Sequence, residues 1–304
     1  MLHFIISSPQ AESRGRYPGR RDILPLMRTR LLALDIDGTL LDPYGSLTDA
    51  ARGAVAAARH AGLAIVLCTG RRFRTALPIA RALELAGPIV VNNGALVKDL
   101  ASSRTLHHHY LPGAVYPEVL ALARSVGPPL VYVDAYPEQT DFLTERAAHA
   151  HPFQREYLRD HGAHCREVED LAAEGRSDVI MASLMADAEA LGVLRSRAAD
   201  ALGSRVHTHV IQNKNYQGAI LEFLSPQSGK WAALARVAEQ AGIAPEAIAA
   251  VGDDVSDVEM LSRAGFGIAM GNAVESAKAA ASFIARSNAE GGVVEAIERV
   301  LLGL

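Results

Sequence analysis

Short apolar runs alternate with amphipathic segments in the first third of the chain. The run Leu31–Leu34 is apolar at every position, which is typical of a parallel strand buried on both faces. Residues 48–60 then place apolar side chains at helical spacing, and Thr48 can cap the start of that helix. The alternation continues with strands at 64–68 and 89–91 and a helix at 72–85 between them. Strands that alternate with helices predict an α/β fold built on a doubly wound parallel sheet.

The pattern changes near residue 95 and changes back near residue 225. Between these positions histidines become frequent, and the helical segments are more polar than those before them. The strands predicted here are 130–133, 179–183, 205–211 and Ala219–Leu224, and the helices are 117–125, 145–159 and 187–201. This part therefore predicts a second module of the α+β class.

After residue 225 the earlier pattern resumes. The predicted strands are 248–251, Phe266–Ala269 and 283–285, and the predicted helices are 230–241, 258–264 and Gly292–Leu302. We therefore expect a core formed by residues 29–94 and 226–304, interrupted by an inserted α+β domain at 95–225.

The composition excludes several classes of protein. The chain has 304 residues, enough for two domains, and only 5% of them are aromatic, so aliphatic cores are expected. A formal net charge of −4 argues against nucleic acid as the main partner. No apolar stretch approaches the roughly 18 residues of a membrane span, so no membrane partner is expected either. The two cysteines, Cys68 and Cys165, form no disulfide framework, which favours a reducing, cytoplasmic location. Oligomeric state does not follow from these properties.

The first 28 residues differ from the rest of the chain. Residues 1–30 contain six arginines and two acidic residues. This composition predicts a disordered N-terminal extension, with a nucleic-acid-binding arm or a targeting peptide as alternatives. Met27 is an alternative start, because the first strand and the first acidic motif follow it directly.

Two carboxylates one residue apart follow the first strand directly. They belong to Asp35-Ile36-Asp37-Gly38-Thr39-Leu40, at the carboxyl end of a strand, where open α/β sheets bind ligands. Phosphoryl transfer mainly requires groups that lie in line and that neutralise charge. We therefore expect Asp35 to be a nucleophile that forms an aspartyl-phosphate, and Asp37 to be a general acid and then a base.

A second acidic cluster follows the strand predicted at 248–251. The sequence Gly252-Asp253-Asp254-Val255-Ser256-Asp257 brings Asp253 to the same edge of the sheet, with Asp257 on the same side of a helix. Mg²⁺ prefers a few carboxylate oxygens together with substrate phosphate and water. We expect Asp35, the backbone carbonyl of Asp37 and Asp253 to bind Mg²⁺, and Asp257 to bind it through water or to hold a ligand. The alternative is that these acidic residues only cap a helix.

Three further segments can supply groups that bind a phosphate. Thr69 and the backbone N–H of Gly70 can donate to phosphate oxygens at a loop that leads into a helix. Lys230 begins a predicted helix and can place a positive charge near the same oxygens. Asn93 follows the third predicted strand, so it should reach the same edge of the sheet. Arg71 is expected either to help hold the phosphate or to pair with an acidic neighbour.

These motifs, in this order, resemble those of the haloacid dehalogenase (HAD) superfamily, and within it the Cof-type phosphatases with a large C2-type cap. The resemblance covers residues of about 29–304. It also rests on Asn93-Gly94-Ala95, Lys230 with Leu234, Met260-Leu261, and Ala269-Met270-Gly271-Asn272-Ala273. It implies a Rossmann-like core, a cap at 95–225, Mg²⁺ as cofactor and an aspartyl-phosphate intermediate. The implied substrates are small phosphorylated metabolites, such as a sugar phosphate, a nucleotide or a phosphorylated cofactor.

Two positions depart from the family pattern. Trp231 stands where glycine usually follows the lysine, and it either crowds the lysine loop or packs beneath it. Ser256 stands where asparagine commonly precedes the last aspartate, so an amide donor is lost. Neither departure involves Asp35 or Asp37, so hydrolysis of a phosphate ester is the leading hypothesis. A phosphomutase or phosphotransferase, or a non-catalytic module that binds a phosphate ligand, are the alternatives.

Other polar residues allow two interpretations each. The segments His107-His108-His109 and His207-Thr208-His209 could hold zinc or face a substrate, but a solvated surface is the simpler expectation. Asp134 either faces the crevice or lies in an exposed turn. Cys68 lies beside Thr69 on an apolar strand, so we expect a core residue, with a thiol function as the alternative.

Overall fold

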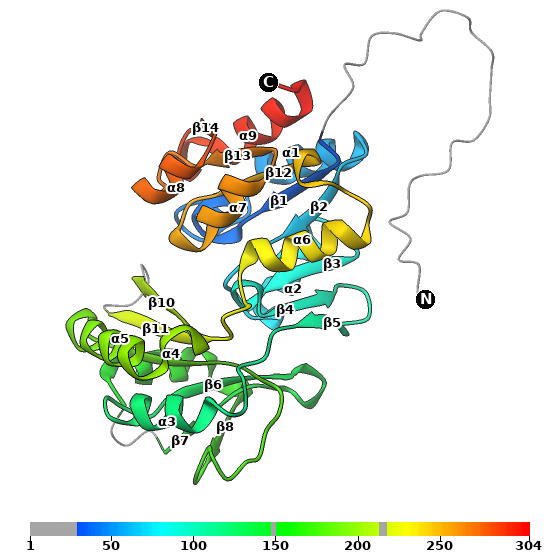
Figure 1. Ribbon diagram of the computed structural model, residues 1–304. Helices are drawn as coiled ribbons and strands as arrows, with labels where there is room; N and C mark the ends of the chain where they lie inside the picture. The colour runs from blue at the N-terminus through cyan, green and yellow to red at the C-terminus, as the bar shows by residue number, and fades with distance from the viewer. Residues whose placement is uncertain (1–28, 147–149, 213–217) are drawn as a thin grey trace, which may run out of the picture. The chain divides into compact units, whose positions relative to one another are not determined.

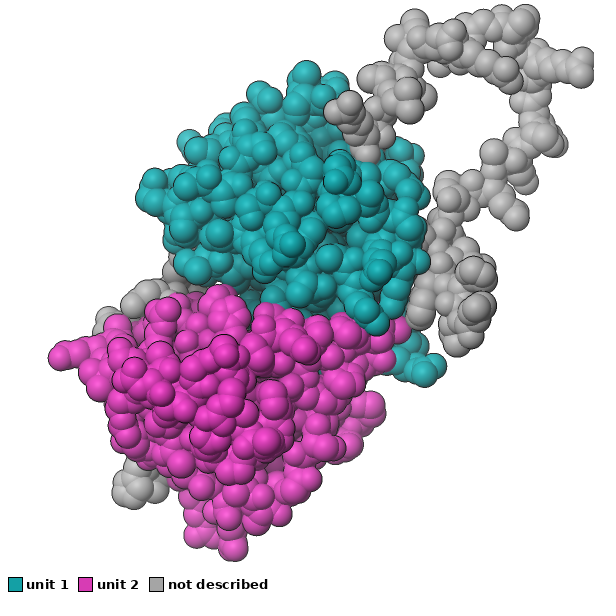
Figure 2. Space-filling view, viewed as in Figure 1, with its two compact units in different colours: residues 1–71, 75–104, 229–304 teal, residues 72–74, 105–228 magenta. Residues whose placement is uncertain are grey.

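The computed structural model describes residues 29–146, 150–212 and 218–304. The expectations for the N-terminal extension lie outside these residues. The described part divides into two compact units (Figure 2). The first contains the described residues up to Arg71 together with Thr75–Arg104 and Gly229–Leu304. The second contains Arg72–Arg74 and Thr105–Ser228.

A five-stranded parallel sheet forms the centre of the first unit (Figure 1). Its strand order is β14-β13-β12-β1-β2, with β1 between two parallel neighbours. The bounds of these strands are β1 Leu31–Leu34, β2 Ala64–Leu67, β12 Ile248–Gly252, β13 Phe266–Ala269 and β14 Phe283–Ile284. Because the sheet is parallel, the loops after β1, β2, β12 and β13 all leave it at one edge.

Helices and a short hairpin complete the first unit. An isolated bridge between Cys68 and Val90 aligns β3 with β2, and β3 pairs with β4 in antiparallel fashion. The strands are β3 Pro88–Val91 and β4 Leu96–Asp99, and the helices are α1 Asp49–His60, α2 Phe73–Ala82, α6 Lys230–Gln240, α7 Val258–Arg263, α8 Glu275–Ala280 and α9 Gly292–Leu302. Helix α2 begins in the second unit and continues into the first.

The second unit is built on a six-stranded mixed sheet with the order β10-β11-β9-β6-β7-β8. Only the pair of β7 and β8 is parallel. The strands of this unit are β5 Thr105–His108, β6 Leu130–Ala135, β7 Thr140–Glu145, β8 Cys165–Val168, β9 Val179–Ala186, β10 His207–Gln212 and β11 Ala219–Leu224, and its helices are α3 Tyr116–Arg124, α4 Pro152–His161 and α5 Ala188–Leu202.

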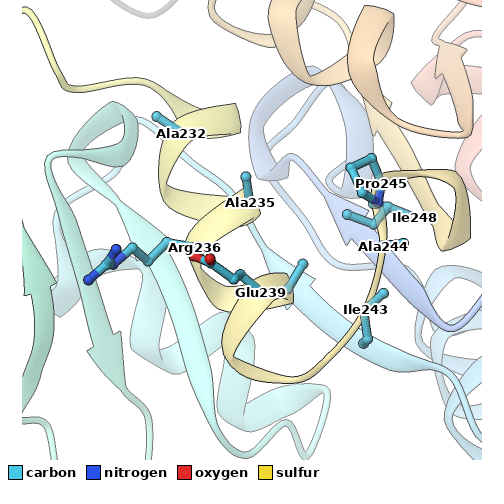
Figure 3. Close-up of a pocket in the computed structure, with 9 residues that line it drawn as sticks. Ala232, Ala235, Arg236, Glu239, Ile243, Ala244, Pro245 and Ile248 are labelled. Carbon is cyan, nitrogen blue, oxygen red and sulfur yellow. The ribbon is translucent and has the colours of Figure 1, made fainter.

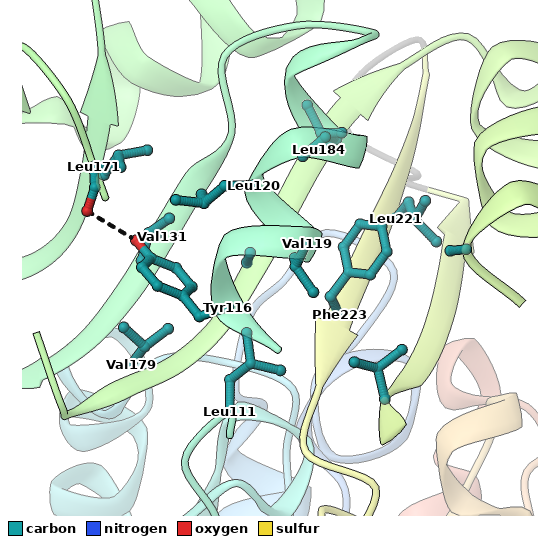
Figure 4. Close-up of a cluster of buried hydrophobic side chains, with 14 of the residues drawn as sticks. Leu111, Tyr116, Val119, Leu120, Val131, Leu171, Val179, Leu184, Leu221 and Phe223 are labelled. Carbon is teal, nitrogen blue, oxygen red and sulfur yellow. Dashed lines mark hydrogen bonds between the residues drawn. The ribbon is translucent and has the colours of Figure 1, made fainter. Parts of the chain in front are cut away.

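An aliphatic core lies under α3 and α5 in this unit (Figure 4). Val119 and Leu120 of α3 are fully buried, as are Leu221 and Phe223 of β11. The hydroxyl of Tyr116 donates to the carbonyl of Leu171, which satisfies the polar end of an otherwise apolar cluster. The second unit therefore has a hydrophobic core of its own.

The fold class predicted from the sequence is confirmed. Strands β1, β11 and β13 and helix α9 have the predicted bounds. The hydroxyl of Thr48 accepts a hydrogen bond from the N–H of Ala51, so it caps α1 as expected.

One predicted helix is wrong in its first part. The pattern predicts a helix at 145–159, but Glu145 ends strand β7 and helix α4 begins at Pro152. Because β7 contains several polar residues, its sequence lacks the apolar pattern that would predict a strand. Asp141 is buried because Arg72 and Arg74 pair with it, and no local pattern shows that pairing.

Over the described residues, no helix is both long and apolar enough to cross a lipid bilayer.

Candidate functional site

The first acidic motif turns sharply as it leaves β1. The N–H of Asp35 still donates to the carbonyl of Val251, which keeps this residue in line with the sheet. Gly38 then adopts a φ of +78°, in the left-handed region that side chains disfavour. A Cβ on Gly38 would lie 2.1 Å from Oδ2 of Asp253, so only glycine permits the approach of the two loops.

Lys230 lies between two buried carboxylates. Its Nζ donates to Oδ1 of Asp35 and to Oδ1 of Asp257, at 2.7 Å in each case. The lysine side chain is 2% exposed, and those of Asp35 and Asp257 are 6% and 0% exposed. The first residue of α6 thus joins the loops after β1 and β12.

Burial and charge set the protonation of this trio. Burial acts to lower the pKa of Lys230, but the carboxylates of Asp257 and Asp35 outweigh it and raise the pKa, so the ammonium stays protonated. Burial raises the pKa of Asp35, aided by Asp257 and Asp253, while Lys230 opposes this. The protein therefore holds Asp35 in a place where its negative charge requires nearby cations.

Asp253 completes a cluster of three carboxylates. One oxygen from each of Asp35, Asp253 and Asp257 lies within 4.8 Å of the others, and all three residues are buried. Over residues 29–146, 150–212 and 218–304, no other group of three or more His, Cys, Asp or Glu side chains meets in this way. The donors are all carboxylate oxygens, which suit a hard cation such as Mg²⁺ and not a thiophilic one. The residues present therefore fit the predicted cofactor.

Asp37 does not belong to this cluster and pairs with Arg71. Nε and Nη2 of Arg71 donate to the two carboxylate oxygens of Asp37 at 2.7 and 2.6 Å. This hydrogen bonding raises the pKa of Arg71, although partial burial opposes it. Of the two interpretations of Arg71, the structure contains the pairing with an acidic neighbour. The Asp37 side chain is 58% exposed, so its carboxylate can meet a ligand from solvent.

The loop after β2 is held against the loop after β3. The hydroxyl of Thr69 accepts a hydrogen bond from the N–H of Arg71, and the Thr69 carbonyl accepts one from the N–H of Asn93. A Cβ on Gly70 would lie 2.9 Å from Oδ1 of Asn93, so the two loops approach closely here. Gly94 in turn packs on the backbone that precedes Lys230. The predicted phosphate-binding residues therefore lie at one edge of the sheet.

Helix capping and the acidic cluster coexist after β12. Asp254 caps the turn at Val255–Asp257, as the capping interpretation requires. The Oδ2 of Asp257 accepts from the N–H groups of Asp253 and Asp254 at 3.0 and 3.1 Å. Since Asp257 also accepts from Lys230, its carboxylate carries three hydrogen bonds that fix the loop and the lysine together.

Two residues that hold Asp253, Thr39 and Asn272, have no role predicted from the sequence. The hydroxyl of Thr39 donates to Oδ1 of Asp253 at 3.2 Å, and Nδ2 of Asn272 donates to its Oδ2 at 3.3 Å. Asn272 lies in the loop that follows β13, after Met270 and Gly271, so the rule that selected Asp35, Thr69 and Asn93 also applies to it. That rule would have found Asn272, because polar residues after parallel strands share one edge.

The structure gives little support for a catalytic or metal-binding role of the remaining residues that the sequence singles out. Trp231 is buried beneath the guanidinium of Arg263, so it packs in the core. Cys68 is buried, and burial raises the pKa of its thiol, which disfavours a thiolate. The Nε2 atoms of His107 and His109 lie 3.0 Å apart, but within the described residues no third metal-ligand side chain joins them. Asp134 accepts hydrogen bonds from the hydroxyls of Thr105 and Tyr110.

An apolar pocket in the first unit lies at the opposite end of β12 (Figure 3). It is lined by α6 and by the segment that leads to Ile248, the first residue of β12. None of the residues predicted from the sequence lines it, and Glu239 is its one acidic residue. The acidic cluster after the carboxyl ends of the strands is therefore the candidate site.

Gly38→Ala is expected to destabilise the protein much more than Gly45→Ala. Both glycines have positive φ, +78° and +77°, but a Cβ on Gly45 would meet no atom within 4 Å. Left-handed strain costs about 1–2 kcal/mol in either variant, whereas only Gly38→Ala must also displace Asp253. In denaturant unfolding, the free energy of unfolding should fall at least about twice as much in Gly38→Ala as in Gly45→Ala. Equal losses would contradict the close approach of the two loops.

Comparisons with known proteins identify the family of this chain. The family model described as haloacid dehalogenase-like hydrolase matches residues 32–297. A 5-amino-6-(5-phospho-D-ribitylamino)uracil phosphatase of Bacillus subtilis (strain 168) is 28% identical over 271 residues, which cover 86% of this chain and 94% of the relative. The pyridoxal phosphate phosphatase of Escherichia coli (strain K12) is 27% identical over 282 residues, with coverages of 89% and 98%. A solved haloacid dehalogenase-like hydrolase from Bacteroides thetaiotaomicron has 29% identity and a TM-score of 0.75, with coverages of 90% and 99%.

Proposed function

Since this chain belongs to the haloacid dehalogenase-like hydrolases and is a phosphatase for small phosphorylated molecules, we propose that it acts through Mg²⁺ and an aspartyl-phosphate on Asp35. The observation that carries the proposal is the buried cluster of Asp35, Asp253, Asp257 and Lys230. The first unit is then the catalytic core and the second unit is the cap.

Asp35 attacks phosphorus in the first step. An Asp35 oxygen forms the new bond to phosphorus while the bond to the ester oxygen breaks, and the leaving oxygen takes a proton from Asp37. In the second step Asp37, now a carboxylate, takes a proton from water, and the water oxygen attacks phosphorus and releases Asp35. Arg71 donates to both side-chain oxygens of Asp37, so it fixes the orientation of the proposed acid and base.

Lys230 and the neighbouring loops supply positive charge and hydrogen-bond donors. The ammonium of Lys230 holds Asp35 in a single orientation and offers its charge to phosphate oxygens. Asp257 keeps that ammonium in place. The hydroxyl of Thr69 and the N–H of Gly70 are proposed to donate to the same phosphate, and Asn93 supports the loop that carries them.

Asp35, Asp253 and the carbonyl of Asp37 are the proposed ligands of Mg²⁺. When bound, the ion neutralises negative charge on the phosphoryl group and on the carboxylates around it. With Asp35, Asp253 and Asp257 ionised and Lys230 protonated, the buried site would carry two negative charges, which a dication would balance. Asp257 is proposed to act on the ion through water or through Lys230, because its oxygens already accept three hydrogen bonds.

The proposed substrate is a small phosphomonoester: a sugar phosphate, a nucleotide or a phosphorylated cofactor. Pyridoxal phosphate and the ribitylaminouracil phosphate named for two relatives are therefore the first compounds to test. We propose no nucleic-acid or membrane partner. The cytoplasmic location predicted from the two cysteines stays a prediction.

Metal removal should abolish the activity reversibly. The purified enzyme is expected to release p-nitrophenol from p-nitrophenyl phosphate with Mg²⁺, to lose this activity in EDTA, and to regain it when Mg²⁺ is added in excess. Zinc and calcium serve as controls, because a site that needs octahedral Mg²⁺ geometry should respond poorly to them. Release of p-nitrophenol at an unchanged rate in EDTA would contradict the proposal.

Transfer to an acceptor hydroxyl is the alternative to hydrolysis. Asp35 and Asp37 would play the same roles, with a sugar hydroxyl in place of water. Product analysis in the presence of candidate sugars separates the two reactions. Hydrolysis predicts inorganic phosphate as the phosphorus-containing product at every sugar concentration.

A further inference from the structure

The loop that joins β13 to α8 fastens the acidic loops to each other. The N–H of Met270 donates to the carbonyl of Gly252 at 3.0 Å, and the N–H of Val274 donates to the carbonyl of Asp253 at 2.9 Å. A Cβ on Gly271 would lie 2.8 Å from the backbone nitrogen of Ser287, so this loop is also packed tightly from behind. The proposed function assigns no role to this loop.

Asn272 is the residue of this loop that reaches both acidic segments. Its Nδ2 donates to the carbonyl of Gly38 at 2.8 Å and to Oδ2 of Asp253 at 3.3 Å. Its Oδ1 accepts a hydrogen bond from the N–H of Asn288 at 2.8 Å. Because a backbone N–H can only donate, this contact fixes which end of the amide faces the acidic loops.

The amide of Asn272 lies where the loop after β1 and the loop after β12 pack tightly against each other. Asp253 is held from one side by Thr39, through Oδ1, and from the other by Asn272, through Oδ2. The same Asn272 nitrogen holds the Gly38 carbonyl, and Gly38 itself has no room for a Cβ beside Asp253. Thr39 and Asn272 thus both tie Asp253 to the β1 loop, and Asn272 also holds the Gly38 carbonyl of that loop.

We infer that Asn272 is a positioning residue that sets the cation site, by holding Asp253 at the distance from Asp35 that one ion can bridge. This inference rests on the proposed function. Asn272 contacts one proposed ligand residue, Asp253, and the backbone carbonyl of Gly38, which directly follows the proposed ligand Asp37. Groups that orient metal ligands from behind typically change metal affinity by about 10–100-fold when they are removed.

The test is a Mg²⁺ titration of the full chain by calorimetry, for the wild type and Asn272→Ala. The dissociation constant of Mg²⁺ is expected to rise by about tenfold or more in Asn272→Ala. Turnover of p-nitrophenyl phosphate should recover towards the wild-type rate at saturating Mg²⁺, because the reacting groups are intact. A merely structural residue would lower the melting temperature without moving the Mg²⁺ dissociation constant.

Asn288→Ala is the matched control. It removes an amide from the same junction, including its bond to the carbonyl of Leu41, but it keeps the backbone N–H that orients Asn272. Its Mg²⁺ affinity should therefore stay close to that of the wild type. Asn272→Ser, a smaller change, provides the measurement if Asn272→Ala does not fold, and the same rise in dissociation constant is expected.

Wild-type Mg²⁺ affinity in a folded Asn272 variant would overturn the inference. In that case a wild type with Mg²⁺-dependent activity would still support the proposed function. A wild type that neither binds Mg²⁺ nor hydrolyses the ester overturns both, so the two failures are distinguishable.

Discussion

Asp35→Asn is expected to lower turnover by a factor on the order of 10⁴ or more while the protein stays folded. The amide cannot attack phosphorus, and loss of a covalent nucleophile has effects of at least this size in other hydrolases. The fold should tolerate the change, because burial raises the pKa of Asp35 and a neutral group avoids the cost of a buried charge. Lys230 keeps Asp257 as its partner.

The measurement is phosphate release from p-nitrophenyl phosphate, together with the melting temperature in the absence of Mg²⁺. The melting temperature of Asp35→Asn is expected to equal or exceed that of the wild type. Asp49→Asn is the control, since its side chain is 97% exposed and lies in α1. Substantial hydrolysis by a folded Asp35→Asn protein would refute the nucleophile assignment.

Lys230→Met is expected to have the largest effect on stability. It leaves the carboxylates of Asp35 and Asp257 buried without the ammonium that both contact at 2.7 Å. Removal of one partner from a buried ion pair typically lowers the free energy of unfolding by about 3–5 kcal/mol. Activity should also fall strongly, because Lys230 orients the nucleophile. Mg²⁺ should restore part of the stability, since it supplies positive charge to the same carboxylates.

Lys278→Met is the matched control for the lysine. Lys278 pairs with Glu275 on the surface of α8, and the Glu275 side chain is 91% exposed. Such a surface ion pair contributes about 1 kcal/mol or less to the free energy of unfolding. Chemical denaturation of both variants, with and without Mg²⁺, gives the comparison, and similar losses for the two would contradict a buried charge cluster at Lys230.

The sequence predicts the core more completely than the inserted module, for a physical reason. Strands β1 and β12 are buried at every position, so continuous apolar runs mark them clearly. Strand β7 contains Asp141 and Thr144, which are buried only because distant groups satisfy them. A local pattern cannot show such partners, so no strand is predicted over β7, and its last residue, Glu145, falls in the helix predicted at 145–159.

The same distinction holds for the candidate site. The residues of the acidic motifs follow buried strands, so their meeting at one edge of the sheet follows from the parallel topology. The pairing of Arg71 with an acidic neighbour is one of two predicted alternatives, and only three-dimensional geometry identifies that neighbour as Asp37. Asn272 contacts Gly38, which is 234 residues away in the sequence, and Asp253, which is 19 residues away. Both contacts depend on a close approach of the loops, which the spacing of residues in the sequence does not show.

The central claim is that Asp35 carries the phosphoryl group during turnover. Its most direct test is an acid quench of the wild-type enzyme in the steady state with Mg²⁺ and substrate, followed by digestion and mass spectrometry. The account predicts one phosphorylated peptide, the one that contains Asp35, and no such peptide from Asp35→Asn. Steady hydrolysis with the phosphoryl group on a different peptide, or on none, would contradict it.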